Sequence, residues 1–309
     1  MDRFYSHGKL MLTGEYVVLD GAKALALPTS FGQHMTVRKT SEDTINWVSK
    51  DHSSHTWFHG TFEFRDHSFS CSSSTNTDIS DRLISILNKA YTLNTKMLDL
   101  VVGTEVTTLL EFPQDWGLGS SSTLINNIAT WLNINPYELL ELTFGGSGYD
   151  IACASASEGI TFQLIGRKPK VSQIEFDPIF KSDLYFVHLN EKQDSREGIL
   201  HYRNTKSNLK TVIAEIDTIT DAMIKSSDLK RFQDLIDSHE MLISRCIQLN
   251  TVKARLFPDF EGSIKSLGAW GGDFILVASA SNPKSYFESK GFPTILNYDE
   301  MILNKKALQ

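Results

Sequence analysis

The sequence predicts an α+β protein of two domains, and three observations carry that prediction. The first half of the chain alternates short apolar runs with turn signals, which is typical of β-strands. The second half holds two long stretches, 206–225 and 228–249, whose apolar residues recur at helical spacing. The pattern breaks at GRKPK, near Arg167–Lys170, so the expected domains are residues 1–167 and 168–309.

The β-leaning part begins within the first forty residues, where apolar runs are separated by turn signals such as Asp20-Gly21. Ser68–Ser80 is expected to be a loop, because Ser, Thr, Asn and Asp dominate its composition. Asp78 or Ser80 then caps a helix that runs through about Tyr91. The expected strands lie at 10–12, 16–19, 24–27 and 34–38, with further β pieces in 45–66 and 97–112.

Helical spacing returns at 124–132. Asn135-Pro136 predicts the start of a second, short helix, because Asn is a good cap and Pro suits the first helical position. That helix ends near the GGSG sequence at 145–148. Beyond it, the two long helices are accompanied by strands expected at 159–165, 171–176, 183–189 and 274–280.

The composition excludes several classes of function. The formal net charge is −7 with no cluster of Lys or Arg, so neither nucleic acid nor an anionic membrane is an expected partner. No apolar stretch approaches the ~20 residues that span a bilayer, and the N-terminus has no signal-peptide pattern. The three cysteines, Cys71, Cys153 and Cys246, are odd in number and far apart, which argues against a disulfide framework and favours a reducing cytoplasm.

The segment EFPQDWGLGSSSTLI, residues 111–125, places small residues between a β-leaning run and a helical pattern. A helix start exposes unpaired N–H groups, glycine lets an anion approach, and serine hydroxyls add donors or ligate Mg²⁺. Gly117–Ser122 therefore has the parts of a triphosphate site, with a tight turn and serine N-caps as the alternative. The P-loop pattern GxxxxGK[ST] occurs nowhere, and a dinucleotide fingerprint would need glycine at Ser122, so both of those sites are excluded.

Three further glycine-bearing segments accompany this one: GKLMLTGEY at 8–16, GSGYD at 146–150 and KSLGAWGGD at 265–273. In this order and at this spacing, they resemble the motifs of the GHMP kinase superfamily, which includes galactokinase, homoserine kinase, mevalonate kinase and phosphomevalonate kinase. Tyr16 stands where mevalonate kinases usually have His, and a Tyr at this position resembles the motif of phosphomevalonate kinases. The resemblance implies a two-domain GHMP kinase fold, with an N-terminal domain like ribosomal protein S5 domain 2 and a ferredoxin-like C-terminal domain.

The resemblance also implies ATP as the phosphoryl donor and Mg²⁺ as the metal. It makes Lys9 and Asp150 catalytic. Lys9 stabilises charge near the transferred group, and Asp150 accepts a proton from a hydroxyl acceptor or holds Lys9 and the metal. The alternatives are a surface lysine on a strand and a helix N-cap. The residues implied to cradle the ATP phosphates are Gly117, Leu118, Gly119, Ser120, Ser121 and Ser122.

For the metal, the resemblance implies Ser121, with Glu141 as the nearest carboxylate and Glu138 as the next. Mevalonate kinases carry a Mg²⁺-binding glutamate before their aspartate, but neither glutamate here has matching spacing. Two exposed glutamates on a helix surface are therefore the alternative. His and Cys show no metal-ligand spacing, and His201 and His239 are expected on helices in structural or exposed positions.

The segment NEKQDSREGI, at 190–199, resembles a substrate-side segment of the mevalonate-pathway members. A phosphorylated acceptor is already anionic and needs cations but no base, for which Lys265 and His7 are further candidates; solvated surface charge is the alternative. The implied function is ATP-dependent transfer to a phosphomevalonate-like acceptor in isoprenoid biosynthesis, with mevalonate or a sugar as alternative acceptors. The implied substrate-binding residues are Lys192, Ser195, Arg196, Gly268, Gly271 and Gly272.

The third motif departs from the family pattern S-G-A-G-G-G, because Leu267 and Trp270 replace a serine and a glycine. Trp270 either narrows the acceptor pocket, stacks on a different acceptor, or marks a non-catalytic nucleotide-binding homologue that serves as a regulator. The decarboxylase branch of the family has a different phosphate loop and is ranked low. A homodimer is an open alternative for the oligomeric state.

Overall fold

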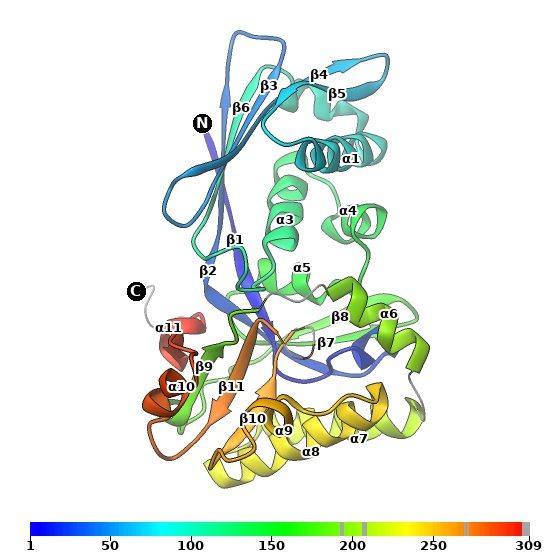
Figure 1. The fold of residues 1–309 in the computed structure, drawn as a ribbon. Coiled ribbons are helices and arrows are strands. Elements are labelled where there is room, and N and C mark those ends of the chain that lie inside the picture. The colour runs from blue at the N-terminus through cyan, green and yellow to red at the C-terminus, as the bar shows by residue number, and fades with distance from the viewer. Residues whose placement is uncertain (192–194, 206–208, 269, 271, 305–309) are drawn as a thin grey trace. The chain divides into compact units, whose positions relative to one another are not determined.

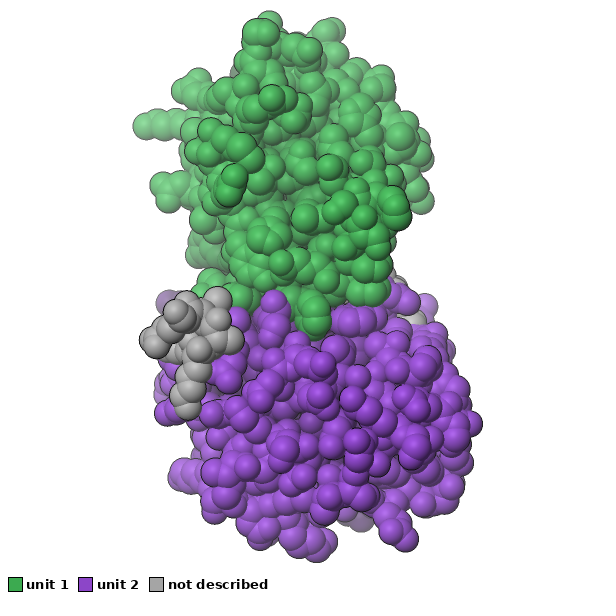
Figure 2. Space-filling view, turned by 90° about the vertical axis from the view of Figure 1, so that its left-hand side faces the viewer, with its two compact units in different colours: residues 1–8, 31–114, 119–155 green, residues 9–30, 115–118, 156–309 purple. Residues whose placement is uncertain are grey.

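The computed structural model describes residues 1–191, 195–205, 209–268, 270 and 272–304 (Figure 1). Its chain forms two compact units, coloured separately in Figure 2 and built from interleaved stretches of sequence. The strands β1 (Asp2–Met11) and β2 (Ala24–Lys39) contribute residues to both units. The expected domains divide the chain at a single point, between residues 167 and 168, and that division stays a prediction. Unit 1 comprises residues 1–8, 31–114 and 119–155, and unit 2 comprises residues 9–30, 115–118 and 156–309.

Unit 1 combines a sheet with helices. The strand order in it is β5-β4-β3-β6-β2, with β3 and β6 parallel and the other neighbours antiparallel. Besides its parts of β1 and β2, its elements are β3 (Ile45–Lys50), β4 (Thr56–Arg65), β5 (Ser68–Ser74), α1 (Thr77–Leu93), η2 (Thr95–Met97), α2 (Leu98–Val101), β6 (Thr104–Leu110), α3 (Ser120–Leu132), α4 (Pro136–Thr143) and α5 (Tyr149–Ala154).

The core of unit 1 lies on one face of this sheet. Buried residues alternate with half-buried ones along β3 and β6, so Ile45, Trp47 and Val106 share a face, as the two-residue period of a strand requires. The apolar stripe of α1, which includes Leu83 and Leu87, packs into the same cluster together with the buried residues of α3. This packing fixes α3, the helix that follows the glycine-serine segment.

Unit 2 contains a second sheet, with the antiparallel order β10-β11-β9-β12, and β7 and β8 beside the first residues of β2. Its elements, besides its parts of β1 and β2, are η1 (Val17–Asp20), β7 (Ile160–Ile165), β8 (Lys168–Gln173), η3 (Lys181–Asp183), β9 (Leu184–His188), α6 (Ser195–Thr205), α7 (Leu209–Ile224), α8 (Leu229–Ile247), α9 (Val252–Leu256), β10 (Ser263–Ser266), β11 (Phe274–Ala278), α10 (Lys284–Ser289), β12 (Ile295–Asn297) and α11 (Tyr298–Met301).

The central strands of this second sheet, β9 and β11, are buried at every residue, which requires cover on both faces. Val187 and Ile275 pack with Phe257 and Phe287 from the region of α9 and α10. The long helix α8 contacts β10 and β11. Strand β10 carries Lys265 and runs directly into the third glycine motif, so the packing of α8 also positions that motif.

Several of the expected elements are confirmed. Both long helices form as α7 and α8, and Asp228 caps α8 by accepting from the Lys230 N–H. Asn135 caps α4 in the same way, with Pro136 at the first helical position. The mixed α+β class is confirmed, while the two finer domain descriptions stay predictions. Within the described residues, no helix is long and apolar enough to cross a membrane.

Four local predictions were wrong. The expected β piece at 97–112 begins with the helix α2 at Leu98–Val101, and only Thr104–Leu110 forms a strand. The first part of Ser68–Ser80 forms the strand β5, because an edge strand tolerates polar residues on its exposed face. The helix α1 is capped by Asn76 rather than by Asp78 or Ser80, since the extended Asn76 accepts from the Ile79 N–H. The expected strand at 16–19 is replaced by η1, because the chain turns at Tyr16, directly before that helix.

Candidate active site

The helix α3 begins directly after a glycine in the left-handed conformation. Gly119 is its N-cap, with a φ of 90°, and no side chain caps this end. The N–H of Thr123 donates to the Gly119 carbonyl at 3.0 Å, so the N–H groups of the preceding turn have no acceptor within the helix. Ser121 is exposed there, whereas the Ser122 hydroxyl donates back to the Gly119 carbonyl at 2.9 Å. The alternative of serine N-caps is therefore wrong, and this helix start offers donors and the positive end of a dipole.

A buried and electrically neutral network anchors α3 within unit 1. The Ser6 hydroxyl donates to Asn127 Oδ1 at 2.8 Å and accepts from Asn126 Nδ2 at 2.9 Å. Thr123 Oγ1 donates to the side-chain oxygen of Gln33, and Asn127 Nδ2 donates to the Gln33 carbonyl, both at 2.9 Å. Paired in this way, these buried polar groups hold the first turns of α3 against β1 and β2.

Asp150 lies in the first turn of α5, which packs against α3. The N-cap of α5 is Gly148, so the alternative that Asp150 caps the helix is wrong. Gly148 has a φ of 88°, and a Cβ there would lie 2.9 Å from the Tyr137 ring. Oδ1 of Asp150 is buried and accepts no hydrogen bond from the described residues. Because an unpaired buried carboxylate oxygen is costly, this position suits a cation or a hydroxyl supplied by a ligand.

The two glutamates considered for the metal lie on α4 and are both exposed. Glu138 accepts from Asn135 Nδ2 at 3.1 Å, which belongs to the start of that helix. Over the described part of the chain, no group of three His, Cys, Asp or Glu side chains could hold a metal ion. Mg²⁺ bound with a nucleotide takes most of its ligands from phosphate and water and needs only one or two from the protein. Ser121 and Asp150 fit that requirement better than Glu141 does. The assignment of Ser121 and Glu141 to the metal stays a prediction.

In unit 2, Lys9 holds the first residues of the glycine-serine segment. Its backbone N–H donates to the Leu118 carbonyl at 3.0 Å, and its Nζ donates to the Gly117 carbonyl at 2.9 Å. Lys9 is on β1 as a strand residue, but its ammonium is fixed against this segment, so the surface-lysine alternative is wrong. Gly117 and Leu118 belong to unit 2, and the chain continues from them into Gly119–Ser122 of unit 1.

Asp273 closes the third motif and was not considered for a role. A Cβ on Gly117 would lie 2.3 Å from Asp273 Cγ, and one on Gly268 would lie 3.2 Å from Asp273 Oδ2, so the carboxylate rests against both glycines. Asp273 is buried and has a φ of 55°, which is uncommon for a residue with a side chain. Trp116 packs edge-on against Phe274, with 5.3 Å between ring centroids. An acid that ends a glycine-rich motif just before a buried strand was the available signal.

The rest of the third motif lies in the turn between β10 and β11. Gly268 and Gly272 are described there, while Gly271 falls outside the described residues. Leu267 is buried, and its N–H donates to the Phe274 carbonyl at 3.2 Å. Trp270 is also buried, packs into the cluster that contains Val17, Tyr202 and Ile243, and donates through its indole to the Asn250 carbonyl at 3.2 Å.

The residues considered for the acceptor have different fates. Lys192 falls outside the described residues, Ser195 begins α6, and Arg196 is exposed in the first turn of that helix. His7 lies on β1, edge-on to the ring of Tyr5. Lys265 was wrong as an anion-binding candidate, because its side chain is fully buried in β10 and forms ion pairs with two glutamates.

Neither a protein-family model nor a curated protein matches this chain. Solved structures match it over nearly all of its length. Streptococcus pneumoniae phosphomevalonate kinase, in complex with phosphomevalonate and AMPPNP, is 15% identical, with 96% of this chain and 100% of that chain covered and a TM-score of 0.71. L. major mevalonate kinase, in complex with R-mevalonate, is 14% identical, with 96% of this chain and 95% of that chain covered and a TM-score of 0.66. Lactococcus lactis galactokinase, complexed with galactose, is 13% identical, with 96% of this chain and 92% of that chain covered and a TM-score of 0.63.

The chain has the GHMP kinase fold. The resemblance that the glycine-bearing motifs predicted is thereby confirmed at the level of the fold. The matched kinases carry different acceptors in their complexes, namely phosphomevalonate, mevalonate and galactose. The acceptor of this GHMP-fold chain therefore has to be argued from its own residues.

Proposed function

We propose that this chain is an ATP-dependent kinase that transfers a phosphoryl group to a small acceptor of the phosphomevalonate type. The observation that carries the proposal is the buried and unpaired Oδ1 of Asp150, on a helix that packs against the uncapped start of α3. A helix start attracts phosphate, and an unpaired buried carboxylate oxygen attracts a cation or a hydroxyl donor. A nucleotide with its metal supplies the phosphate and the cation, and a hydroxyl acceptor supplies the hydroxyl donor.

Each residue then has a defined task. The N–H groups of Gly119–Ser122 would donate to phosphate oxygens, and the Ser121 hydroxyl and Asp150 carboxylate would hold Mg²⁺, which supplies neutralisation of phosphate charge when bound. Asp150 also accepts the proton that the acceptor hydroxyl loses. Lys9, already fixed at the Gly117 carbonyl, donates to an oxygen of the transferred group and stabilises the charge that develops there.

The acceptor is proposed to carry a phosphate of its own. Arg196 is exposed at the start of α6, and Lys192 and Ser195 belong to the same segment of sequence, so this segment supplies donors for an anion. Tyr16 stands where mevalonate kinases usually have His, which favours the phosphomevalonate type. Lys265 is buried and ion-paired, so the proposal of a phosphorylated acceptor rests on Arg196, Lys192 and Tyr16.

One observation favours a second candidate, a nucleotide-binding homologue that does not turn over. Trp270 occupies a position that is glycine in the family pattern, and it is buried in the core of unit 2. Such a change either reshapes the acceptor site or removes it. The two candidates differ in a simple way, because the second binds ATP but consumes none in the presence of any acceptor.

The test is an ADP-release assay with MgATP and, separately, phosphomevalonate, mevalonate, galactose and homoserine, together with calorimetric titration of ATP. We expect the highest kcat/KM with phosphomevalonate. Preference for galactose would replace the acceptor proposal with a sugar kinase. Binding of ATP without consumption in any of the four reactions would establish the non-catalytic homologue instead.

A further inference from the structure

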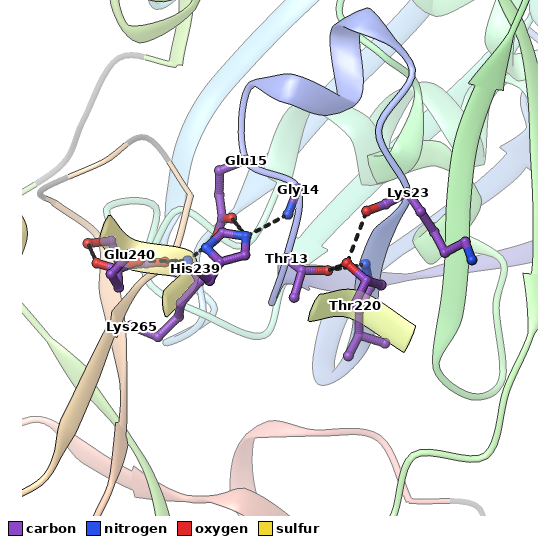
Figure 3. Close-up of polar contacts among 10 residues, drawn as sticks. Thr13, Gly14, Glu15, Lys23, Thr220, His239, Glu240 and Lys265 are labelled. Atoms are coloured by element: carbon purple, nitrogen blue, oxygen red, sulfur yellow. Dashed lines mark hydrogen bonds and ion pairs between the residues drawn. The ribbon is translucent and has the colours of Figure 1, made fainter. Parts of the chain in front are cut away.

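Three consecutive residues at the end of the first motif are each held by a different element of unit 2 (Figure 3). The middle one, Gly14, has a φ of 89°, and a Cβ there would lie 3.0 Å from Ala24, so only glycine fits this close approach. The segment Thr13–Glu15 is therefore fixed residue by residue. The pairs are Thr13 with Thr220 of α7 at 2.8 Å, Gly14 with His239 of α8 at 3.0 Å, and Glu15 with Lys265 of β10.

The residue that follows is strained. Tyr16 has φ 61° and ψ −50°, and the Val17 N–H donates to the Glu15 carbonyl at 2.7 Å, which makes a γ-turn with a positive central φ. Backbone of this kind persists only when its surroundings hold it. The Tyr16 ring stacks on Tyr202, with 5.6 Å between centroids, and a Cβ on Gly198 would lie 2.6 Å from its hydroxyl. What fixes Glu15 therefore also directs Tyr16 toward α6.

The contacts that fix Glu15 form a buried cluster with unequal charges, which we call the Glu15 cluster: Glu15, His239, Glu240 and Lys265. Their side chains are at most 4% exposed. Lys265 Nζ is 3.0 Å from Glu240 Oε1 and also donates to Glu15 Oε1, so one cation faces two carboxyl groups. Glu240 Oε2 accepts a further bond from the Ser266 hydroxyl at 2.8 Å. With both carboxyl groups ionised, the cluster would bury a net negative charge, which is expensive.

The hydrogen bonds at His239 show where a proton would remove that charge. Nε2 of His239 accepts from the Gly14 N–H, so this nitrogen carries a lone pair and the imidazole is neutral. Glu15 Oε2 lies 3.3 Å from the same nitrogen and has no other partner among the described residues. His239 Nδ1 and Glu240 Oε1 are the other buried atoms of the cluster without a hydrogen bond among those residues, but Glu240 Oε1 is ion-paired with Lys265 at 3.0 Å. An ionised Glu15 Oε2 would set its own lone pair against that of His239 Nε2. A protonated oxygen would instead donate to this lone pair, which it would share with the Gly14 N–H.

We propose that Glu15 is a positioning residue that keeps a proton on Oε2 in the folded protein and donates it to His239 Nε2. The proton makes the Glu15 cluster neutral, leaves Glu240 as the ionised partner of Lys265, and fixes the turn at residues 13–16. The proposal concerns the structure of unit 2 and holds whatever the acceptor of the proposed kinase is.

The electrostatic surroundings agree with this assignment. Burial raises the pKa of Glu15 to about 7; Lys265 opposes the rise and Glu240 adds to it. Burial, and then Lys265, hold the pKa of His239 well below its ordinary value. For Lys265, burial lowers the pKa but the two glutamates outweigh it and raise it. The other ionisable group beside Glu15 is Tyr16, whose pKa burial and Glu15 raise together.

The first test uses Glu15→Gln, because a glutamine reproduces the protonated form: its oxygen accepts from Lys265 and its amide donates to His239. Infrared difference spectra at pH 6, in H₂O and D₂O, should show a protonated carboxyl band in the wild type that is lost in Glu15→Gln. The same band should persist in Glu288→Gln, which changes an exposed glutamate of α10. Glu240→Gln should also remove the band, because Lys265 then needs Glu15 ionised.

The second test follows stability with pH. A group whose pKa is raised on folding stabilises the protein fully below its unfolded pKa, here near 4.5, and loses that contribution as the pH rises to about 7. The wild-type unfolding constant should therefore rise relative to that of Glu15→Gln by up to about tenfold per pH unit in this window, and run parallel to it above. Glu288→Gln should run parallel to the wild type throughout.

Three outcomes would overturn the proposal. A Glu15→Gln protein that is severely destabilised at pH 6, or that fails to fold, would show that Glu15 is an ionised partner of Lys265. A wild-type spectrum without the carboxyl band would show the same directly. Parallel pH profiles for the wild type and Glu15→Gln between pH 5 and 7 would mean that Glu15 does not hold the proton.

Discussion

Both units bury carboxylate oxygens that accept no hydrogen bond from the described residues: Asp150 Oδ1 in unit 1, and in unit 2 Glu15 Oε2 together with Glu240 Oε1, which is ion-paired with Lys265. Their surroundings differ. Asp150 is half-buried, and the polar network that anchors the neighbouring α3 is neutral. Glu15 is fully enclosed, with a cation, a second carboxylate and an imidazole against it. Asp150 is partly exposed, so a ligand can approach its side chain, whereas the enclosed Glu15 has room for a proton alone.

A buried carboxylate oxygen without a hydrogen-bond partner therefore indicates different roles in different surroundings. At Asp150 the unpaired oxygen suits a cation or a hydroxyl donor, so it points to chemistry. At Glu15 the oxygen is proposed to carry a proton that it donates to His239 Nε2, next to a strained turn, so it points to position.

The largest effect is expected at Asp150. Replacing it with Asn keeps the size of the side chain but removes the charge that binds the metal and accepts the proton, so turnover should fall by roughly 10²–10⁴-fold. Binding of ATP without metal should change little, because the α3 start is intact. Steady-state kinetics and calorimetry measure the two quantities. Asp81→Asn, an exposed site on α1, is the matched control. Near-normal turnover in Asp150→Asn would remove Asp150 from the mechanism.

The next effect is a loss of stability at Lys265. Lys265→Met takes the cation from the Glu15 cluster and leaves Glu240 ionised and unpaired, which should cost about 3–5 kcal/mol in the free energy of unfolding. Denaturant unfolding at pH 8 measures this loss. Lys210→Met, on the exposed face of α7, should stay within about 0.5 kcal/mol. A similarly small loss for Lys265→Met would mean that the Glu15 cluster is not cohesive.

Local sequence signals predicted the four longest helices, α1, α3, α7 and α8, and the family of folds. Periodicity over 206–249 predicted α7 and α8, because an amphipathic stripe of that length has few other solutions. The serine-rich 68–80 segment misled, since pairing with β4 at the sheet edge outweighs its composition. The turn at Tyr16 was read as a strand because its γ-turn depends on contacts with α7, α8 and β10, more than 200 residues away.

The site was predictable where a motif sits on its own backbone and unpredictable where side chains meet across the sequence. Gly119 and the serines could be recognised because a helix start needs only neighbouring residues. Lys265 was taken for an anion-binding cation because the sequence does not show that Glu15 and Glu240 enclose it. Asp273 was overlooked for a similar reason, since its contact with Gly117 joins positions 156 residues apart.

The smallest effect tests the metal on the Asp150 side of the comparison. Ser121→Ala removes one exposed hydroxyl from the start of α3 and leaves the neutral network of Thr123 and Asn127 in place. Losing one charge-assisted contact of about 1.5 kcal/mol should raise the Mg²⁺ concentration for half-maximal turnover by roughly tenfold, with kcat at saturating Mg²⁺ little changed. Ser73→Ala, at an exposed position of β5, should leave the Mg²⁺ titration unaltered. An unchanged titration in Ser121→Ala would mean that Ser121 does not bind the metal, and Asp150 would then be the protein ligand that remains.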